Sequence, residues 1–203
     1  DSHGGGSMSD WPFDGLERGK YGAILTDPPW AFPRWAGPAI PARQNNQPYQ
    51  SILCEEVGRM PVGELAAPDC VAFVWVTWPM LLECVAAIEA WGFKYKTCAF
   101  AWVKGNNTQP DFFTEEVPAQ IGMGYWTRSN SEVCLLATRG KPKRLNADVR
   151  QGIIAPRREH SRKPDGIHDR IERLVAGPYC ELFARQSTRP GWDFWGNQTD
   201  KFN

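Results

Sequence analysis

Short apolar runs alternate along the chain with segments whose apolar residues recur at helical spacing. Buried strands are predicted for the runs 23–25, 70–76, 93–103, 132–138 and, as the last strand, 180–184, with a short apolar segment at 152–155. Between them, Leu81, Val85 and Ile88 mark one face of a helix. A second helix, predicted to start at Pro164, carries its apolar stripe at positions 167, 171, 174 and 175. Strands that alternate with helices predict an α/β fold with a mainly parallel, doubly wound sheet.

The first predicted strand is followed directly by Asp27, Pro28, Pro29 and Trp30. The prolines fix φ and donate no N–H, so the strand must end there and a stiff loop begins. Open α/β sheets place their active sites at the carboxyl ends of their strands. An aspartate followed by two prolines is also typical of an ordinary turn, and that interpretation stays open for the tripeptide alone.

The chemistry of this loop suits alkylation of an aromatic amine. The exocyclic amine of adenine is a poor nucleophile because its lone pair is delocalised into the ring. The Asp27 carboxylate and the Pro28 carbonyl can accept hydrogen bonds from that amine, and a rigid loop holds both acceptors in place. Trp30 is predicted to offer a flat face to a base that has been extruded from its strand.

Two long polar segments, 31–48 and 105–125, are predicted to be loops, and Tyr49 ends the first of them. A long loop directly after a candidate catalytic motif is often a lid or a substrate contact, with an ordinary surface loop as the alternative. Between positions 139 and 163, Arg and Lys far outnumber Asp148 and Glu159. This basic stretch is predicted to form a phosphate-contacting rim beside the active site; the alternative is a solvated loop face.

Composition narrows the class of protein. The chain has 203 residues, a length typical of one domain. Residues 1–7 are interpreted as the remnant of an expression tag, and residues 8–203 as that single domain. No apolar run reaches the roughly 18–20 residues that a membrane span needs, so a cytoplasmic location without membrane contact is expected. The six cysteines include no C-x-x-C pair, which favours reduced thiols over disulfides and predicts no metal site. A net charge of zero is unusual for a protein that grips nucleic acid alone, which makes a homodimer or a partner subunit plausible.

An ordered set of motifs resembles the MT-A70 family of adenine-N6 methyltransferases, whose members act on RNA or on DNA. The motifs run from about residue 21 to residue 198 and comprise 27–30 (Asp-Pro-Pro-Trp), Tyr49, 73–77, 91–93, 102–104, 160–164, 181–185 and 196–198. The resemblance implies a Rossmann-like class I methyltransferase fold that is circularly permuted, with the strand before Asp27 preceding the cofactor strand and lying beside it.

The resemblance also implies S-adenosylmethionine as the cofactor and no metal. It places Lys163 against the carboxylate of the methionine part, and a position before the predicted helix would suit an anion. The cofactor residues that it implies are Asp10, Asp27, Lys163, Phe183, Arg185, Asn197 and Gln198. It implies that Tyr49 lies near the target base, with simple anchoring of the loop as the alternative. Ser187 stands where the family often has histidine, so one ribose contact is absent or replaced.

Three functions follow from these observations. The preferred hypothesis is an adenine-N6 methyltransferase acting on DNA, because the compact chain carries no appended RNA-binding module. Contacts with the nucleic acid are expected from the basic stretch 139–163 and from the loops 31–48 and 105–125. The alternatives are an RNA adenine-N6 methyltransferase and a non-catalytic partner subunit, a type of family member that degrades the Asp-Pro-Pro-Trp motif or the cofactor pocket.

Overall fold

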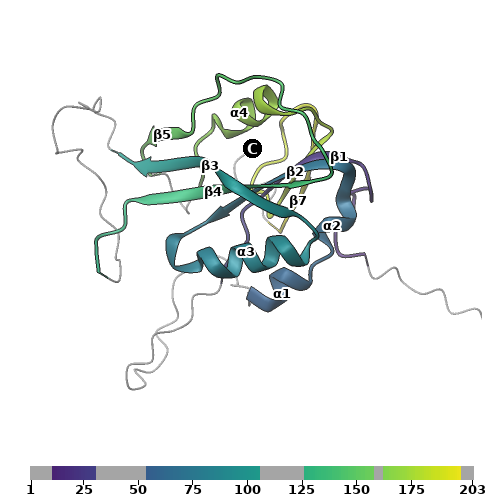
Figure 1. Ribbon diagram of the computed structural model, residues 1–203, viewed down its shortest axis with the longest axis horizontal. Coiled ribbons are helices and arrows are strands. Elements are labelled where there is room, and N and C mark those ends of the chain that lie inside the picture. Colours follow the sequence, from purple (N-terminus) through teal and green to yellow (C-terminus); the bar gives the residue numbers. More distant parts are fainter. Residues whose placement is uncertain (1–10, 31–53, 106–125, 158–161, 198–203) are drawn as a thin grey trace, which may run out of the picture.

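The computed structural model describes residues 11–30, 54–105, 126–157 and 162–197, and its centre is one seven-stranded sheet. The strands are β1 (Tyr21–Thr26), β2 (Ala66–Val76), β3 (Lys94–Lys104), β4 (Ser131–Arg139), β5 (Gly152–Ala155), β6 (Tyr179–Leu182) and β7 (Trp192–Trp195). Their spatial order is β5-β3-β4-β2-β1-β6-β7 (Figure 1). Only β4 runs antiparallel to its neighbours, so the predicted mainly parallel sheet is confirmed.

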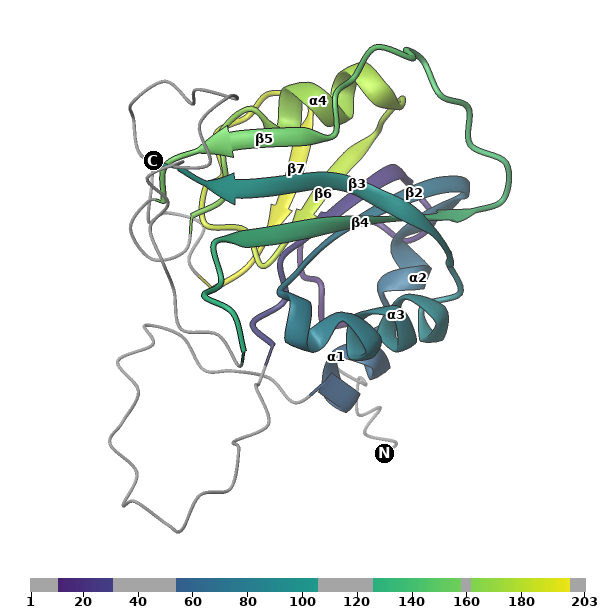
Figure 2. The ribbon, with the colours of Figure 1, turned by 60° about the vertical axis from the view of Figure 1, so that its left-hand side comes forward.

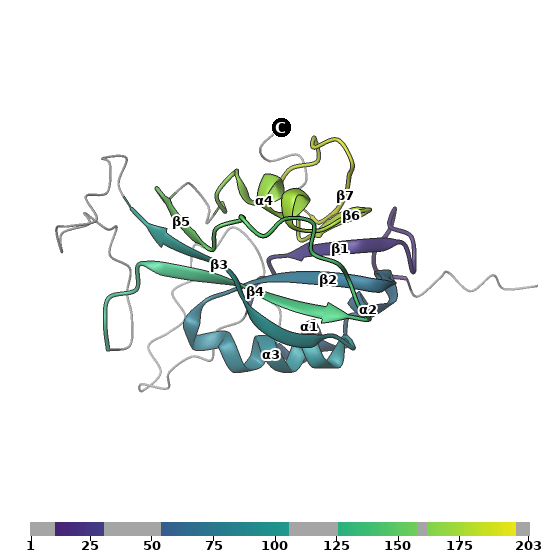
Figure 3. The same ribbon diagram turned by 45° about the horizontal axis from the view of Figure 1, so that its top comes forward.

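Helices cover both faces of this sheet, as the views in Figures 1 and 3 agree. One face carries α1 (Cys54–Arg59), α2 (Val62–Leu65), the 3-10 turn η1 (Trp78–Met80) and α3 (Leu81–Ala90), and the other carries α4 (Ile167–Leu174). The two faces have separate apolar cores. Alternate residues of β2 enter each of them: Val74 packs with Ile88 of α3, whereas Phe73 belongs to the core of Ile171 on α4. A strand buried on both faces explains the continuous apolar run in the sequence.

The strand order creates a switch point between β1 and β6. β1 pairs in parallel with β2 on one side and with β6 on the other, so that Thr26 lies opposite both Val74 and Leu182. Chain connections leave in opposite directions from this point, and such crevices are where open α/β sheets bind ligands. The predicted adjacency of the first strand and the strand that follows α4 is confirmed. The edge at which β1, β2, β6 and β7 end is called the carboxyl edge below.

Two elements differ from the sequence-based expectation. The last strand is not the run at 180–184 but β7, which carries Asp193 within it and pairs in parallel with β6. Asp193 accepts hydrogen bonds from Tyr21 Oη at 2.8 Å and Lys20 Nζ at 3.0 Å, which ties β7 to β1. Helix α4 begins at Ile167 after Gly166, not at Pro164, because residues 164–166 form a turn.

The six cysteines are all free thiols, as predicted, and four of them are buried. Burial raises the pKa of the Cys70 and Cys84 thiols to about 12, so both are protonated and unreactive at neutral pH. Within the described ranges no helix is long and apolar enough to cross a membrane. Nor do those ranges contain a group of three His, Cys, Asp or Glu side chains that could hold a metal ion.

Candidate active site at the carboxyl edge

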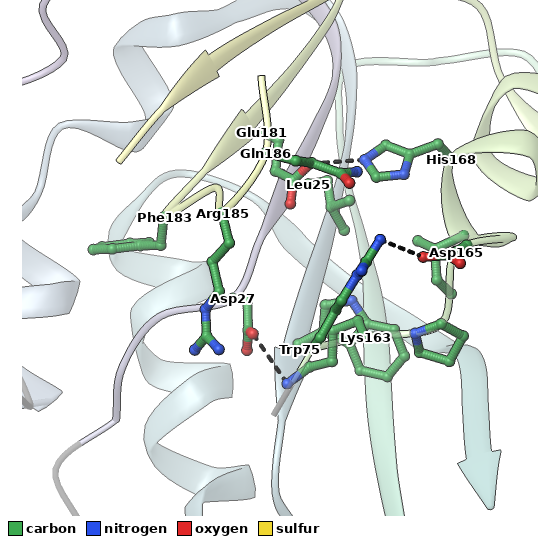
Figure 4. Close-up of a pocket in the computed structure, with 13 residues that line it drawn as sticks. Leu25, Asp27, Trp75, Lys163, Asp165, His168, Glu181, Phe183, Arg185 and Gln186 are labelled. Atoms are coloured by element: carbon green, nitrogen blue, oxygen red, sulfur yellow. Dashed lines mark hydrogen bonds and ion pairs between the residues drawn. The ribbon is translucent and has the colours of Figure 1, made fainter. Parts of the chain in front are cut away.

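A cleft opens at the carboxyl edge between β1, β6 and the turn that precedes α4 (Figure 4). Its walls are formed by Leu25, Asp27, Trp75, Arg162, Lys163, Pro164, Asp165, Ile167, His168, Glu181, Phe183, Arg185 and Gln186. The space enclosed by these side chains is about 60 Å³. This inner space is smaller than the roughly 300–1,000 Å³ of most sites for small ligands, and the cleft is also open to solvent.

The bridge across the cleft is an ion pair. Lys163 Nζ lies 3.0 Å from Asp27 Oδ2 and 2.9 Å from Glu132 Oε2, and only 17% of the lysine side chain is exposed. Lys104 at the end of β3 contacts the second oxygen of Glu132. Asp27, Lys163, Glu132 and Lys104 therefore form a chain of alternating charges, called the charge chain below.

Burial and pairing act against each other on these groups. Burial by itself lowers the pKa of the Lys163 ammonium, but the Asp27 and Glu132 carboxylates raise that pKa above its usual value. Burial raises the pKa of Glu132, yet Lys163 and Lys104 together bring it below its usual value. Lys163 and Glu132 are consequently charged at neutral pH, and a ligand meets a fixed ammonium inside the cleft.

Lys163 does not lie at a helix N-terminus, contrary to the expectation. The first helical residue of α4 is Ile167, so the backbone N–H groups of that helix are one turn further along the chain. The two carboxylates, and not a helix end, hold the ammonium in place. Lys163 and Asp27, both candidate cofactor residues from the sequence, line the same cleft.

The loop after β1 is braced by two hydrogen bonds. The Trp30 backbone N–H donates to the Pro28 carbonyl at 2.8 Å, which closes a tight turn around Pro29. The indole Nε1 of Trp30 donates to the Trp75 carbonyl at 3.0 Å. A carbonyl oxygen has two lone pairs, so Pro28 keeps one acceptor position for a substrate.

Trp30 lies in the core, which corrects the expectation of an open ring face. The residue is 7% exposed and packs in the apolar core under α1 and α3. Its contribution in this structure is to fix the position of the loop, because its indole bonds to the neighbouring strand. A base that stacks at this edge needs another aromatic surface.

Phe183 has a strained backbone. Its φ is 58°, in the left-handed region that bulky residues avoid. This left-handed conformation turns the chain sharply after β6, and Arg185 and Gln186 then lie along the cleft wall. The Phe183 ring packs edge-on against Trp195 at 5.3 Å between ring centroids. Strained residues of this kind cluster at ligand sites, which fits the inclusion of Phe183 among the candidate cofactor residues.

Gly196 brings β7 close to the same turn. A Cβ atom at this position would lie 2.7 Å from the Ala184 carbonyl oxygen and 2.8 Å from the Ala184 nitrogen. That nitrogen donates to the Trp195 carbonyl at 3.0 Å. The segment after β6 and the end of β7 are therefore in direct backbone contact at the carboxyl edge. Asn197, the next residue, is exposed there and does not line the cleft.

Substitution of Gly196 by alanine is expected to lower the free energy of unfolding by about 1–3 kcal/mol, because backbone atoms must move apart. The melting temperature measures this change. Gly152→Ala is the matched control, since a Cβ atom at Gly152 in β5 meets nothing within 4 Å. Equal melting temperatures for the two variants would show that the close approach at Gly196 is not required.

His168 and Glu181 form a second polar pair in the cleft wall. His168 Nε2 lies 2.7 Å from Glu181 Oε2, and the imidazole packs edge-on against Trp192 at 4.6 Å. His168 is 6% exposed, so this histidine of α4 is buried against the sheet. Its ring is thus part of the wall and connects α4 to β6 and β7.

Three predicted site residues, Asp10, Tyr49 and Gln198, lie outside the described residues, as do the loops 31–48 and most of 105–125. The structure brings together Asp27, Lys163, Phe183 and Arg185 in the cleft. The sequence reasoning missed Glu132 and Lys104. A signal existed for both, because each charged residue directly adjoins an apolar run, 98–103 of β3 for Lys104 and 133–137 of β4 for Glu132.

The basic stretch 139–163 does not form one rim, which corrects the expectation. Arg139 ends β4 at the edge opposite to the carboxyl edge, where it donates to the Gly63 carbonyl. The chain then passes Arg144, which bridges to Val175 after α4, and returns along β5 (Figure 2). Within the described part, only the positions after β5 lie at the carboxyl edge.

Comparison with known proteins shows the family of this chain. Residues 21–198 match the MT-A70 family. The type II methyltransferase M.MunI from Mycoplasma sp is 30% identical over 204 residues, which cover 92% of this chain and 81% of that protein. The catalytic subunit METTL3 of the human N(6)-adenosine-methyltransferase is 30% identical over 188 residues, 90% of this chain. A putative N(6)-adenosine-methyltransferase MT-A70-like protein from Medicago truncatula is 31% identical over 89% of this chain.

These relatives differ in how much of them the chain spans. It covers most of M.MunI but only 29% of human METTL3 and 26% of the Medicago protein. The match nevertheless extends over nearly the whole of this chain and includes β1, the cleft and β7. The protein described here belongs to the MT-A70 family of adenine-N6 methyltransferases.

Proposed function

We propose that the protein transfers a methyl group from S-adenosylmethionine to the N6 amine of adenine in DNA. The observation that carries this proposal is the position of Asp27, at the β1–β6 switch point and within 3.0 Å of the buried Lys163 ammonium. Preference for DNA is supported by M.MunI, a type II methyltransferase of which the chain covers 81%. The strand order, with β1 before and beside β6, supports a circularly permuted class I methyltransferase fold.

The cleft residues have the chemistry that S-adenosylmethionine needs. The Lys163 ammonium suits the carboxylate of the methionine part, and Asp27 suits its amino group. Leu25 and Phe183 offer apolar surface, and Arg185 offers hydrogen-bond donors to a ribose. When bound, this cofactor supplies a methyl group on a sulfonium, which is a strong electrophile. Lys163 can give up Asp27 for a ligand carboxylate because Glu132 still holds its ammonium.

Asp27 and Pro28 act on the amine of the substrate. The carboxylate and the carbonyl accept hydrogen bonds from its two N–H groups, which draws the nitrogen lone pair out of the plane of the ring. The tight turn at Pro28 and the bond from Trp30 to Trp75 fix both acceptors before the substrate arrives. Little reorganisation is then needed during the reaction, which is the main source of such catalysis.

The test of this function is methylation of matched nucleic-acid pools. Duplex DNA, single-stranded DNA and RNA of the same sequence are incubated with the protein and the methyl donor, and the nucleosides are identified by mass spectrometry. N6-methyladenine in DNA is the expected product. Product in RNA alone would favour the RNA alternative, for which METTL3 is the relevant relative. Donor binding without product in any pool would favour a partner subunit.

Replacement of Lys163 by methionine is expected to weaken binding of S-adenosylmethionine by about 1–3 kcal/mol, roughly 5- to 150-fold, since a charge-assisted hydrogen bond is lost. Methionine keeps the apolar length of the side chain. Calorimetry measures the affinity. Lys141→Met is the control. Lys141 is exposed, follows β4 at the edge opposite to the cleft, and its variant should bind the donor as the wild type does. Unchanged affinity in Lys163→Met would contradict the assignment of the cleft.

A further inference from the structure

Aromatic side chains at the carboxyl edge divide into buried and exposed ones. Trp30 and Trp75 are buried, whereas Trp78 is 52% exposed and Trp126 is fully exposed. Trp78 follows β2 and Trp126 precedes β4, and because β4 is antiparallel to β2, both belong to the carboxyl edge. Tyr95 is also exposed, but it lies near the start of β3, at the opposite edge.

Trp78 is held in place although half of it faces solvent. Its indole Nε1 donates to Ser131 Oγ at 3.0 Å, and Ser131 is the first residue of β4. Val103 pairs with Ser131, so the acceptor sits on a strand that is itself anchored in the sheet. An exposed tryptophan with a fixed edge loses little conformational freedom when a flat ligand stacks on its ring. The arrangement adds little to the apolar core, which points to a role in binding.

The distance from the candidate catalytic aspartate suits a neighbour of the target nucleotide. Asp27 follows Thr26, which lies opposite Val74, and Trp78 is four residues beyond Val74. β2 ends at Val76 and Trp78 begins the 3-10 turn, so at most three residues of extended chain and one strand spacing of about 4.8 Å separate the two backbones, on the order of 10 Å. Arg128, exposed and three residues before Ser131, brings a positive charge to the carboxyl edge, where β4 begins.

We propose that Trp78 stacks on a base that flanks the target adenine in the DNA strand, with Arg128 near the backbone phosphates. Stacking on an aromatic side chain is tolerant of sequence, because every base has a flat face. It also stabilises a locally unstacked strand, which a target base extruded from its duplex requires. This inference rests on the proposed function and assigns to Trp78 the surface that the buried Trp30 cannot provide.

The test compares Trp78→Ala, Trp78→Phe and the wild type by fluorescence anisotropy with a labelled single-stranded DNA. Loss of stacking should raise Kd about 5- to 100-fold in Trp78→Ala, whereas Trp78→Phe keeps most of the affinity. Tyr95→Ala, an exposed aromatic residue at the opposite edge, is the matched control and should bind DNA as the wild type does. Binding of S-adenosylmethionine and the melting temperature should stay unchanged in all three variants.

Each outcome separates this inference from the function on which it rests. If the wild type methylates DNA and Trp78→Ala binds DNA equally well, the role of Trp78 is overturned and the proposed function stands. If Trp78→Ala lowers the melting temperature, or weakens donor binding by the same factor as DNA binding, the role of Trp78 is structural and the inference fails. If the wild type binds the donor but neither binds nor methylates DNA, the proposed function fails and the inference fails with it.

Discussion

Replacing Asp27 by asparagine is expected to reduce methyl transfer to adenine by at least about 100-fold while the fold is kept. An amide donates as well as accepts, and it carries no charge, so the amine of the substrate loses its strongest acceptor. Removal of one preorganised electrostatic contact from an active site typically costs about 100- to 1,000-fold in rate. The fold is expected to survive because Lys163 keeps Glu132 as its partner and Asp27 itself is partly exposed.

Initial rates on a DNA substrate measure this effect, with circular dichroism as the check on folding. The control is Asp148→Asn, since Asp148 pairs with Arg173 on the surface and both side chains are more than half exposed. It should leave the rate and the fold unchanged. A rate in Asp27→Asn within a few-fold of the wild type would rule out the proposed role of the carboxylate, whatever the substrate is.

The elements that the sequence predicted well are those whose local residue pattern, an apolar run or a pair of prolines, determines the structure without distant partners. β2 is an unbroken apolar run because both of its faces are covered, by α3 on one side and by α4 on the other. β5 coincides with the short apolar segment 152–155, although the sequence alone predicted no strand for that segment. The end of β1 at Thr26, shortly before the two prolines, follows from proline chemistry alone.

The features that the sequence did not predict depend on partners far away in the chain. Asp193 interrupts the aromatic residues of β7, and its hydrogen bonds to Tyr21 and Lys20, which tie this strand to β1, cannot be read from the local sequence. Proline is typical of a first helical turn, but the turn at 164–166 comes before α4 and leaves Lys163 free to reach Asp27 and Glu132. Such pairings are fixed by tertiary contacts, which local patterns do not contain.

The candidate site shows the same division. Asp27 and Lys163 stand in motifs that a reader of the sequence can find, and the structure places them 3.0 Å apart. The burial of Trp30 could not be read from the motif, because an aromatic ring that follows a turn can pack inward or outward with equal ease. Glu132 was recognisable only as a charge in an apolar strand, and its importance follows from its two lysine partners.

Glu132 is the residue on which the charge chain depends for its balance. Its side chain is 9% exposed and accepts contacts from two ammonium groups, each less than one-fifth exposed. Without its negative charge, Lys104 and Lys163 face each other as like charges in a poorly solvated place, with Asp27 as the only remaining carboxylate of the chain. Breaking a buried ion pair typically costs about 3–5 kcal/mol because it leaves an uncompensated charge.

Glu132→Gln is therefore expected to lower the free energy of unfolding at pH 7 by about 2–4 kcal/mol, a loss reduced by the partial exposure of the lysines. For a protein of this size the melting temperature should fall by roughly 5–12 °C. Thermal unfolding followed by circular dichroism measures it. Glu55→Gln breaks an exposed pair with Arg59 and should change the free energy by less than about 0.5 kcal/mol.

The pH dependence gives the sharper test. Because Lys163 and Lys104 hold the pKa of Glu132 below its ordinary value of 4.5, the carboxylate stabilises the fold above pH 4.5 and loses that effect as the pH falls through its folded pKa. The difference in melting temperature between the wild type and Glu132→Gln should therefore be constant from about pH 6 to 8 and shrink below pH 4.5. Asp193 and Glu172, whose pKa values are also lowered, protonate in both proteins and leave this difference intact. A difference that persists unchanged under acid conditions would mean that packing, and not the charge of Glu132, stabilises this part of the cleft.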